Sequence, residues 1–556
     1  SVMEQLRLKI QAFVKELYST DEVVEFTRPD EQFGDFATNI AMKLAKNLGK
    51  NPREIAEEIS VKIRDELTTE LADVSVAGPG FLNLTLSDEA LIKLLDENIS
   101  QVYAGKQIVA EYSDPNPFKV LHAGHLYTSI VGDSIANLLE AAGGDVHRVN
   151  FGGDVGLHVG RTMWAILKFL GGENPEKLVE IEEAKRSEWM ASCYIEGTNA
   201  YEDSEDAKAI IIELNKRVYQ LHRDNDHAST FAQIYWTCRQ WSYDYFAKFY
   251  ERIGTNFEKY YPESEVAELG LKTVREQLEK GVYQESDGAI IFDGEKYGLH
   301  TRVFINSEGL PTYEAKDVGL IMHKFNDYHF DKSVVITGNE QEQYMAVVLK
   351  SLEQFKPELV KATSHLTHGI VKLAGGVKMS SRKGNILRAV DVLDVASEAN
   401  KNATGSDDQS VVIGAVKYAF LKVRTGGDII YDPDESVSLL GNSGPYLQYA
   451  HARARSILSK AKLNEVALEE LESDERSLVR KIGEYTDVVD KAVIDLMPHL
   501  VCTYLYELAQ VFNRFYEKNR VIGDEREALR VQLVSLYADR LKEGLGLLGI
   551  TAPDRM

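Results

Sequence analysis

Cysteine is scarce in this chain, which has three cysteines among 556 residues. They stand at positions 193, 238 and 502, without a CxxC pair or a nearby pair of histidines. This spacing excludes a disulfide framework and a cysteine-based zinc site, so we expect no zinc and assign no metal ligands. It also favours a reducing compartment, and we expect the protein to be cytoplasmic.

Long apolar runs are missing as well. No uninterrupted apolar stretch approaches the roughly 18 residues that a membrane-spanning helix needs. Residues 1–20 are amphipathic and interrupted by charges, which is unlike the apolar centre of a signal peptide. We therefore expect a protein that is neither secreted nor inserted into a membrane.

The length and composition are those of a globular protein with several domains. Hydrophobic residues make up 44% of the chain and charged residues 27%. A chain of 556 residues is too long for one ordinary core, so two to four domains are expected.

The net charge of −24 argues against a polyanionic partner when it is taken over the whole chain. The charge is unevenly distributed, however. Residues 1–110 contain 12 basic and 19 acidic side chains, whereas residues 441–556 contain 16 and 18. The C-terminal part is nearly neutral, so local basic stripes there could hold a nucleic acid, although charge alone gives no positive evidence of one.

The first 150 residues predict two different modules. Residues 2–86 indicate two or three helices followed by a hairpin that turns at Gly78-Pro79-Gly80. From residue 107 the pattern changes to a strand at 108–110, an amphipathic helix and a strand at 146–151. This order is typical of one unit of a parallel sheet.

The rest of the chain predicts an insertion, a return to the sheet and a helical end. Residues 161–300 are rich in helical patterns, charges and tryptophan, with a hairpin near 288–292, and indicate an insertion rather than more parallel sheet. Strands are expected at 333–337 and 369–373, with a helix at 340–355 between them. From about residue 436 the pattern is helical to the end.

The sequence therefore predicts a multidomain α/β protein with a Rossmann-like parallel-sheet domain. We expect an N-terminal α+β module at 1–87, the parallel-sheet domain at 105–400 with its insertion at about 161–300, a connecting segment at 401–435 and an all-helical domain at 436–556.

Two motifs could carry chemistry. The first is His122-Ala123-Gly124-His125, at a predicted strand-to-helix junction. A helix N-terminus offers backbone N–H groups to phosphate, and the histidines could donate hydrogen bonds to its oxygens. Alone the motif is weak, because two histidines at this spacing are often only a polar helix start.

The second motif is KMSSRKGN at residues 378–385, which follows the turn Ala374-Gly375-Gly376. Its cations and hydroxyl groups suit a loop that neutralises a pyrophosphate leaving group. A solvated basic loop is an equally good interpretation of this segment taken alone.

The order and spacing of the two motifs resemble those of the class I aminoacyl-tRNA synthetases. The segment Glu111-Tyr112-Ser113-Asp114-Pro115-Asn116 is similar to the signature that precedes the histidine motif in arginyl-tRNA synthetases. Further segments resemble that family in order along essentially the whole chain, at residues 34–39, 51–56, 78–81, 150–160, 446–453 and 546–556.

This resemblance implies an arginine–tRNA ligase. In the family, ATP activates L-arginine to arginyl-adenylate, and the arginyl group passes to the 2′-hydroxyl of the 3′-terminal adenosine of tRNA(Arg), with release of pyrophosphate and AMP. The expected partners are tRNA(Arg), L-arginine and ATP with Mg²⁺. No DNA, membrane or zinc is expected, and we expect a monomer.

The resemblance also assigns roles to individual residues. The catalytic group is His122, His125, Lys378, Ser380 and Lys383. ATP is expected to contact His122, Gly124, His125, Lys378, Met379 and Ser380. Arginine is expected to contact Glu111, Asn116, Tyr313, Asp317 and Gln341, because paired carboxylates match a guanidinium. The C-terminal helices should bind tRNA through Tyr446, Tyr449, Arg453, Asn513 and Tyr516.

Some positions depart from the family pattern, and other interpretations stay open. Arg382 stands where a second loop lysine is usual, and Tyr127 and Thr128 stand where an Arg-Ser pair is common. Without the resemblance, Glu111 would be an exposed acid at a strand end and Asp317 an acid on a helix surface. The alternatives are another class I ligase, such as a cysteinyl-type enzyme, and an inert relative that binds only tRNA or a protein.

Overall fold

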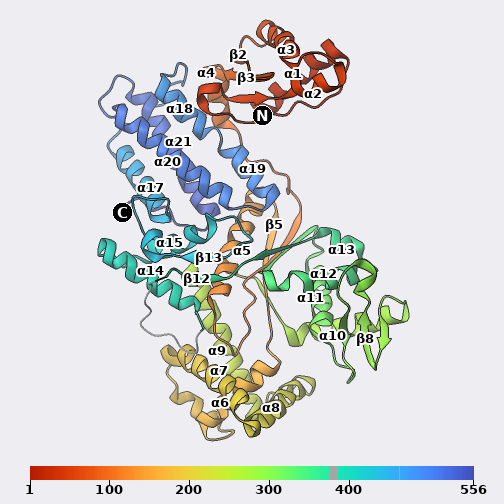
Figure 1. The fold of residues 1–556 in the computed structure, drawn as a ribbon. Helices are drawn as coiled ribbons and strands as arrows, with labels where there is room; N and C mark the ends of the chain where they lie inside the picture. Colours follow the sequence, from red (N-terminus) through yellow and green to blue (C-terminus); the bar gives the residue numbers. More distant parts are fainter. Residues whose placement is uncertain (376–385, 463) are drawn as a thin grey trace.

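The computed structural model describes residues 1–375, 386–462 and 464–556. A small N-terminal module and a helical insertion lie at opposite ends of the molecule, with a parallel sheet between them (Figure 1). The C-terminal helices lie between the N-terminal module and the sheet. The predicted residues Lys378, Met379, Ser380 and Lys383 lie outside the described part of the chain.

The N-terminal module packs helices on a small antiparallel sheet of order β1-β3-β2. Asn51 caps the third helix and Pro52 occupies its first turn, where a missing N–H group costs nothing. Its elements are α1 (Val2–Tyr18), β1 (Phe36–Thr38), α2 (Ile40–Leu48), α3 (Pro52–Glu66), β2 (Leu71–Ala77) and β3 (Phe81–Leu86). The predicted helices and hairpin are confirmed, and β1 is an additional strand.

The central sheet consists, among the described residues, of parallel strands in the order β11-β10-β4-β5-β6. Its strands are β4 (Gln107–Glu111), β5 (Asp145–Gly152), β6 (Lys259–Pro262), β10 (Lys332–Gly338) and β11 (Thr363–His368). Ile108 and Ala110 share a core with α5 (Ala123–Ala141), whereas Val109 shares one with α11 (Tyr313–Tyr328) and α12 (Glu342–Glu353). Since alternate residues of a strand point to opposite faces, helices cover both faces of the sheet.

The predicted strands at 108–110, 146–151 and 333–337 are confirmed, but two expectations about the sheet are wrong. Residues 161–300 were expected to form an insertion without parallel-sheet strands, but strand β6 lies within this range and pairs with β5 in the parallel sheet. Strand β11 was missed, and the strand expected at 369–373 is instead β12 (Val371–Leu373), which pairs with β13 (Ile429–Tyr431) away from the central sheet. Strand β6 is four residues long with two tyrosines, and β11 is mostly polar, so neither gives an apolar run.

The insertion between β5 and β6 is helical and has a core of its own. Its helices are α6 (Leu157–Leu170), α7 (Arg186–Asp203), α8 (Glu205–Arg223) and α9 (Thr230–Ile253). After β6, α10 (Glu263–Glu279) packs against α11, and β7 (Gln284–Ser286), β8 (Ala289–Phe292) and β9 (Arg302–Ile305) form an antiparallel sheet. The hairpin expected near residue 288 is confirmed, and α13 (Pro357–Ala362) precedes β11.

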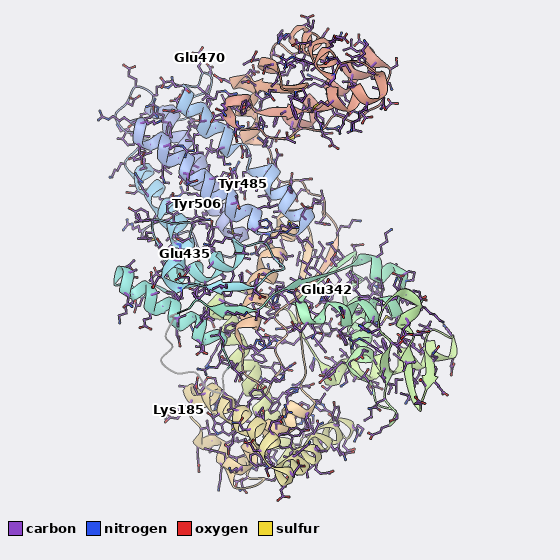
Figure 2. All side chains as sticks on the ribbon, in the orientation of Figure 1. Lys185, Glu342, Glu435, Glu470, Tyr485 and Tyr506 are labelled. Atoms are coloured by element: carbon purple, nitrogen blue, oxygen red, sulfur yellow. The ribbon has the colours of Figure 1, made fainter. Side chains whose placement is uncertain are left out.

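The C-terminal part is helical after residue 436, as predicted. Figure 2 places Tyr485 and Tyr506 among these helices and Lys185 in the insertion. The helices after residue 436 are α17 (Gly444–Ser459), α18 (Ser473–Ile482), α19 (Tyr485–Asp495), α20 (His499–Lys518) and α21 (Glu527–Leu547), and they follow α14 (Ala389–Thr404), α15 (Gln409–Leu421) and α16 (Pro433–Ser436). Helix α15 and strand β13 lie in the range that was expected only to connect two domains. Among the described residues, no helix is both long and apolar enough to cross a bilayer.

Candidate active site

A cavity of about 820 Å³ opens where β4, β5 and β10 end. Carboxyl ends of parallel strands are the usual place for a ligand site in such sheets, because the loops there diverge. Every predicted ATP or arginine contact that the structure describes lines this cavity: Glu111, Asn116, His122, Gly124, His125, Tyr313, Asp317 and Gln341. Residues from three separate segments of sequence, 111–125, 313–317 and 341, thus face one space.

The histidine motif forms the first turn of α5, as expected. The His122 backbone N–H donates to His125 Nδ1 at 3.2 Å, and the two ring centroids are 3.8 Å apart. A Cβ atom at Gly124 would lie 3.0 Å from the His122 ring, so glycine keeps this turn open. Burial lowers the pKa of His122, and it lowers the pKa of His125 further, well below its ordinary value. Both rings are therefore largely neutral at pH 7.

The backbone of this turn is not wholly free for a ligand, which corrects the expectation of unpaired N–H groups. The Ala123 N–H donates to the Leu387 carbonyl at 2.8 Å, and the Ala389 N–H donates to the Leu121 carbonyl at 2.9 Å. Residues 387–389 follow the second motif closely in sequence. These two hydrogen bonds therefore hold the chain just beyond that motif against the histidine turn.

Asp317 lies one turn after Tyr313 on α11, as the predicted helix required. The Tyr344 hydroxyl donates a hydrogen bond to the Asp317 carboxylate. Burial raises the pKa of Asp317 to about 7. Tyr313 is 62% exposed and also lines the cavity, which places it at the mouth. The interpretation of Asp317 as an acid on a helix surface is wrong.

Glu111 ends β4 and is only 3% exposed, so it is not an exposed acid at a strand end. The Lys324 ammonium donates to Glu111 Oε1 at 2.7 Å. Burial opposes ionisation of Glu111, but Lys324 outweighs it and holds the pKa of the carboxyl below its usual range. Burial and the charge of Glu111 raise the pKa of neighbouring Asp114 well above its ordinary value. Sequence reasoning missed Lys324 because it lies 213 residues from its partner.

Glu263 is another residue of the cavity that sequence reasoning missed. It begins α10 directly after β6, is buried, lines the cavity and forms an ion pair with Lys316. The Gly153 N–H donates to Asn116 Oδ1 at 2.6 Å, and a Cβ atom at Gly153 would lie 2.6 Å from Glu263 Oε2. Asn116 and Glu263 therefore meet beside Gly153. The sequence signal that could have identified Glu263 is an acid directly after a strand, but strand β6 was not predicted.

The predicted tRNA contacts gather on two packed helices, α17 and α20. Asn513 Nδ2 donates to the Tyr446 hydroxyl at 2.9 Å, and the Arg453 guanidinium lies 5.0 Å from the centre of the Tyr516 ring. Tyr446 and Tyr516 pack partly against the hydrophobic core, whereas Tyr449 is 45% exposed. Part of this aromatic set is thus structural, and part faces solvent.

Family models match all three parts of the chain. The model described as tRNA synthetases class I (R), catalytic domain, matches residues 90–432. The DALR anticodon binding domain matches residues 447–556, and the arginyl tRNA synthetase N terminal domain matches residues 4–86. The parallel-sheet fold with its cavity is therefore that of a class I tRNA synthetase, and the predicted fold class is confirmed.

Similar proteins narrow the class further. Arginine–tRNA ligases of Porphyromonas gingivalis and Flavobacterium psychrophilum are each 30% identical over 100% of both chains. Two solved arginyl-tRNA synthetases share the fold. That of Thermus thermophilus has a TM-score of 0.82 at 23% identity over 100% of both chains. That of Plasmodium falciparum has 0.80 at 22%, over 100% of this chain and 99% of its own.

The chain belongs to the arginyl-tRNA synthetase family, and it is an arginine–tRNA ligase that uses ATP. The predicted family and activity are thereby confirmed.

Proposed function

We propose that this one cavity carries out both steps of arginylation. L-Arginine attacks the α-phosphate of ATP to give arginyl-adenylate and pyrophosphate, and the 2′-hydroxyl of the 3′-terminal adenosine of tRNA(Arg) then takes the arginyl group and releases AMP. The observation that carries this proposal is the meeting of buried carboxylates and the histidine turn in a single cavity. Two substrates of opposite charge can then bind in contact with each other.

At the ATP end, His122, Gly124 and His125 contact the phosphates in this proposal. The reaction needs little acid–base chemistry, because the main demand is to stabilise charge on the pentavalent phosphorus and the leaving pyrophosphate. Both imidazoles are neutral in the empty cavity, so they meet ATP through N–H groups and gain protons as phosphate charge approaches. Lys378, Met379, Ser380 and Lys383 supply the remaining contacts from outside the described residues.

Mg²⁺ is proposed to enter with ATP, whose phosphate oxygens supply most of its ligands. Glu340 lines the cavity close enough to influence His122, and its carboxylate is the kind of oxygen donor that Mg²⁺ prefers. The ion would neutralise phosphate charge.

At the amino-acid end, Asp317 and Glu111 bind the guanidinium group, and Tyr313 forms the outer wall. Paired acceptors match the planar fork of arginine and leave the ammonium of lysine poorly satisfied. Asn116 and Gln341 hold the α-amino and α-carboxylate groups. Glu263 adds a negative charge beside Asn116, which suits an α-ammonium.

The tRNA is proposed to contact both ends of the chain. Bases of the anticodon stack on α17 and α20 and hydrogen-bond to their polar side chains. The residues proposed there are Tyr446, Tyr449, Arg453, Asn513 and Tyr516. The N-terminal module contacts the tRNA elbow, where Phe81, 41% exposed at the start of β3, offers a stacking surface.

The domain limits and the assembly are also proposals. The tRNA-recognition module spans residues 1–87, the catalytic domain 105–400 with its insertion, the connecting segment 401–435 and the anticodon-binding domain 436–556. One chain carries the cavity and both tRNA-binding parts, which supports a monomer that needs neither DNA nor a membrane. Its three cysteines are free and buried, in keeping with work in the reducing cytoplasm.

The test is ATP-dependent charging of total tRNA with each amino acid in turn. We expect charging with arginine alone, together with arginine-dependent pyrophosphate exchange measured with and without tRNA. Exchange that appears only with tRNA would make tRNA part of the assembled site. Binding of tRNA without charging by any amino acid would contradict the proposal and favour an inert relative.

A further inference from the structure

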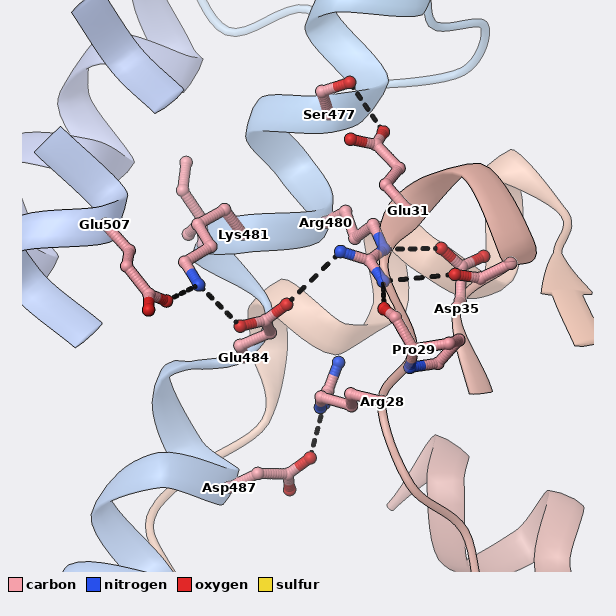
Figure 3. Close-up of polar contacts among 12 residues, drawn as sticks. Arg28, Pro29, Glu31, Asp35, Ser477, Arg480, Lys481, Glu484, Asp487 and Glu507 are labelled. Carbon is pink, nitrogen blue, oxygen red and sulfur yellow. Dashed lines mark hydrogen bonds and ion pairs between the residues drawn. The ribbon is translucent and has the colours of Figure 1, made fainter. Parts of the chain in front are cut away.

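A buried ion cluster joins the N-terminal module to α18 of the C-terminal helices (Figure 3). Its centre, which we call the Asp35 cluster, consists of Asp35, Arg476 and Arg480. Asp35 is only 1% exposed, although it belongs to a loop of the module. Arg476 lies 2.7 Å from Asp35 Oδ2, and Arg480 Nε lies 3.0 Å from Asp35 Oδ1.

The two arginines of the cluster also donate hydrogen bonds to backbone carbonyls of the module. Arg480 also donates to the Pro29 carbonyl at 2.7 Å and to the Gly34 carbonyl at 3.1 Å. Arg476 donates to the Leu86 carbonyl at 2.9 Å. The two guanidinium groups thus bind backbone carbonyls of the module as well as the Asp35 carboxylate. Such bonds fix an orientation, which an apolar contact alone would not do.

The segment that directly follows the module forms a second attachment to the same helix, with apolar contacts and an ion pair of Asp88 with Arg476 at 3.7 Å. Helix α4 (Asp88–Lys93) contacts α18, and a Cβ atom at Gly483 would lie 3.0 Å from Leu94. This attachment lies in the segment that connects the module to the catalytic domain. By itself it would leave the module free to rotate about this single point of contact. The Asp35 cluster supplies the second point. Outer pairs flank it, Arg28 with Asp487 and Ser477 with Glu31.

We propose that Asp35 is a positioning residue for tRNA: by binding Arg476 and Arg480 it holds the N-terminal module at a fixed angle to the anticodon-binding helices. The inference rests on the proposed contact of this module with the tRNA elbow. A tRNA that touches both parts binds tightly only when their spacing matches its own. Asp35 is not among the residues that line the catalytic cavity, so its effect passes through the placement of the module and not through the chemistry.

The first experiment measures placement in the full-length chain without tRNA. Nitroxide labels at Glu57→Cys in α3 and Lys542→Cys in α21 report the distance between the two parts by pulsed electron resonance, since the native cysteines are buried. We expect one narrow distance distribution in the parent and a broad one after Asp35→Asn. An unchanged, narrow distribution in Asp35→Asn overturns the inference.

The second experiment separates tRNA binding from chemistry. Asp35→Asn should raise the KM for tRNA by about tenfold or more, because one of two linked contacts loses its geometry. It should leave kcat at saturating tRNA within about twofold and the KM for ATP unchanged. A purely structural defect would instead lower the active fraction, and kcat would fall with no change in KM.

Glu475→Gln is the matched control. Glu475 is also a buried carboxylate of α18 held by two arginines, Arg526 and Arg530, but both belong to the helical domain itself. This variant should lower the melting temperature and leave the label distance and the KM for tRNA unchanged. An equal rise in the KM for tRNA in Glu475→Gln would overturn the inference, because general damage to α18 would then explain both variants.

Two further variants keep the outcomes distinct. Phe81→Ala tests whether the module contacts tRNA at all: if it raises the KM for tRNA and Asp35→Asn does not, the placement inference fails and the proposed contact stands. If neither variant changes the KM for tRNA, the contact fails too. If Asp35→Asn does not fold, Arg480→Lys replaces it as the test variant. This substitution keeps the positive charge but loses the hydrogen bonds to the Pro29 and Gly34 carbonyls. It should also broaden the label distance distribution and raise the KM for tRNA.

Discussion

Glu111 is buried and Asp317 is half-buried, and both line the cavity as proposed arginine contacts, but their neighbours put them in different states. Lys324 keeps Glu111 ionised, whereas among the described residues the direct hydrogen-bond partner of Asp317 is the Tyr344 hydroxyl, and its pKa is about 7. The cavity therefore holds one carboxylate that is ionised at neutral pH and one that titrates near pH 7, and the proposed binding of arginine would ionise the second fully.

This difference predicts a pH dependence of arginine binding. Below pH 7 Asp317 is largely protonated, and the guanidinium must displace that proton, so affinity rises with pH. The dissociation constant for arginine should fall about tenfold per pH unit from about pH 5 to 6.5 and level off above about pH 8. Calorimetry on the full chain measures this. Asp317→Asn should bind weakly and lose the slope; the same slope in that variant would assign the titration to another group.

Lys324 can be tested through its partner. Lys324→Met should raise the KM for arginine and lower the free energy of unfolding by about 3–5 kcal/mol, because it leaves Glu111 charged or protonated without its ion pair. Urea denaturation and arginine titrations measure the two effects. Adding Glu111→Gln should recover part of the stability but not the KM. Wild-type arginine use in Lys324→Met would show that the pair is not part of the pocket.

His122 is predicted to act on chemistry and not on tRNA. His122→Ala should reduce arginine-dependent pyrophosphate exchange by about a hundredfold or more, because a donor to the developing phosphate charge is lost. Filter binding should show tRNA affinity unchanged. Aminoacylation at the wild-type rate would remove His122 from the mechanism.

At the scale of elements, helices α10 and α11 cross at a pair of glycines. A Cβ atom at Gly319 would lie 2.2 Å from the Val266 carbonyl, and one at Gly270 would lie 2.1 Å from the Ala315 carbonyl. The close crossing sets the position of α11, which carries Tyr313 and Asp317 into the cavity.

Gly319→Ala should therefore push α11 away from α10. We expect a loss of about 1–3 kcal/mol in the free energy of unfolding and a higher KM for arginine, with little change in the KM for ATP. Gly546→Ala is the control, because a Cβ atom there meets nothing within 4 Å. Equal effects of the two substitutions would contradict the role of the crossing.

The sequence predicted the elements that carry a strong local pattern. Strand β4, helix α5 and strand β10 have clear apolar periodicity and were predicted from it, whereas the placement of Glu111 beside His122 came from the family resemblance, and both residues line the cavity. Strand β6 was missed because Lys-Tyr-Tyr-Pro is polar, aromatic and four residues long. The ion pairs of Glu111 with Lys324 and of Glu263 with Lys316 span 213 and 53 residues, and no local pattern encodes such partners.

At the scale of the whole molecule, the C-terminal tail, residues 551–556, hydrogen-bonds to α17 of the helical domain. Gln448 of α17 donates to the Thr551 carbonyl at 2.9 Å, and His451 Nδ1 donates to the Pro553 carbonyl at 2.8 Å. Both side chains are buried, so they depend on the tail for these hydrogen bonds. The tail thereby fixes the helix that carries several proposed tRNA contacts.

Removing residues 551–556 should leave these two side chains without those partners. Gln448 keeps its hydrogen bond to the Ser410 carbonyl at 3.2 Å, so His451 is the side chain left unpaired, and we expect a loss of about 1–3 kcal/mol in the free energy of unfolding and a higher KM for tRNA. Arginine binding should not change, since the cavity is made by other segments. Alanine at both Gln448 and His451 in the truncated chain should restore part of the stability; a truncated chain as stable as the parent would show that the tail is dispensable.

The strand order of the central sheet also has a consequence for synthesis. The sheet places β4 directly beside β10, and 224 residues separate Gln107 from its hydrogen-bond partner Asp331. A ribosome adding about 5–20 residues per second needs roughly 10–45 s to cover that distance. During this time β4 can pair with β5, while its other edge stays open on the nascent chain. An unpaired, apolar strand edge is a template for aggregation, so the nascent chain is exposed to aggregation at this edge until β10 has been made.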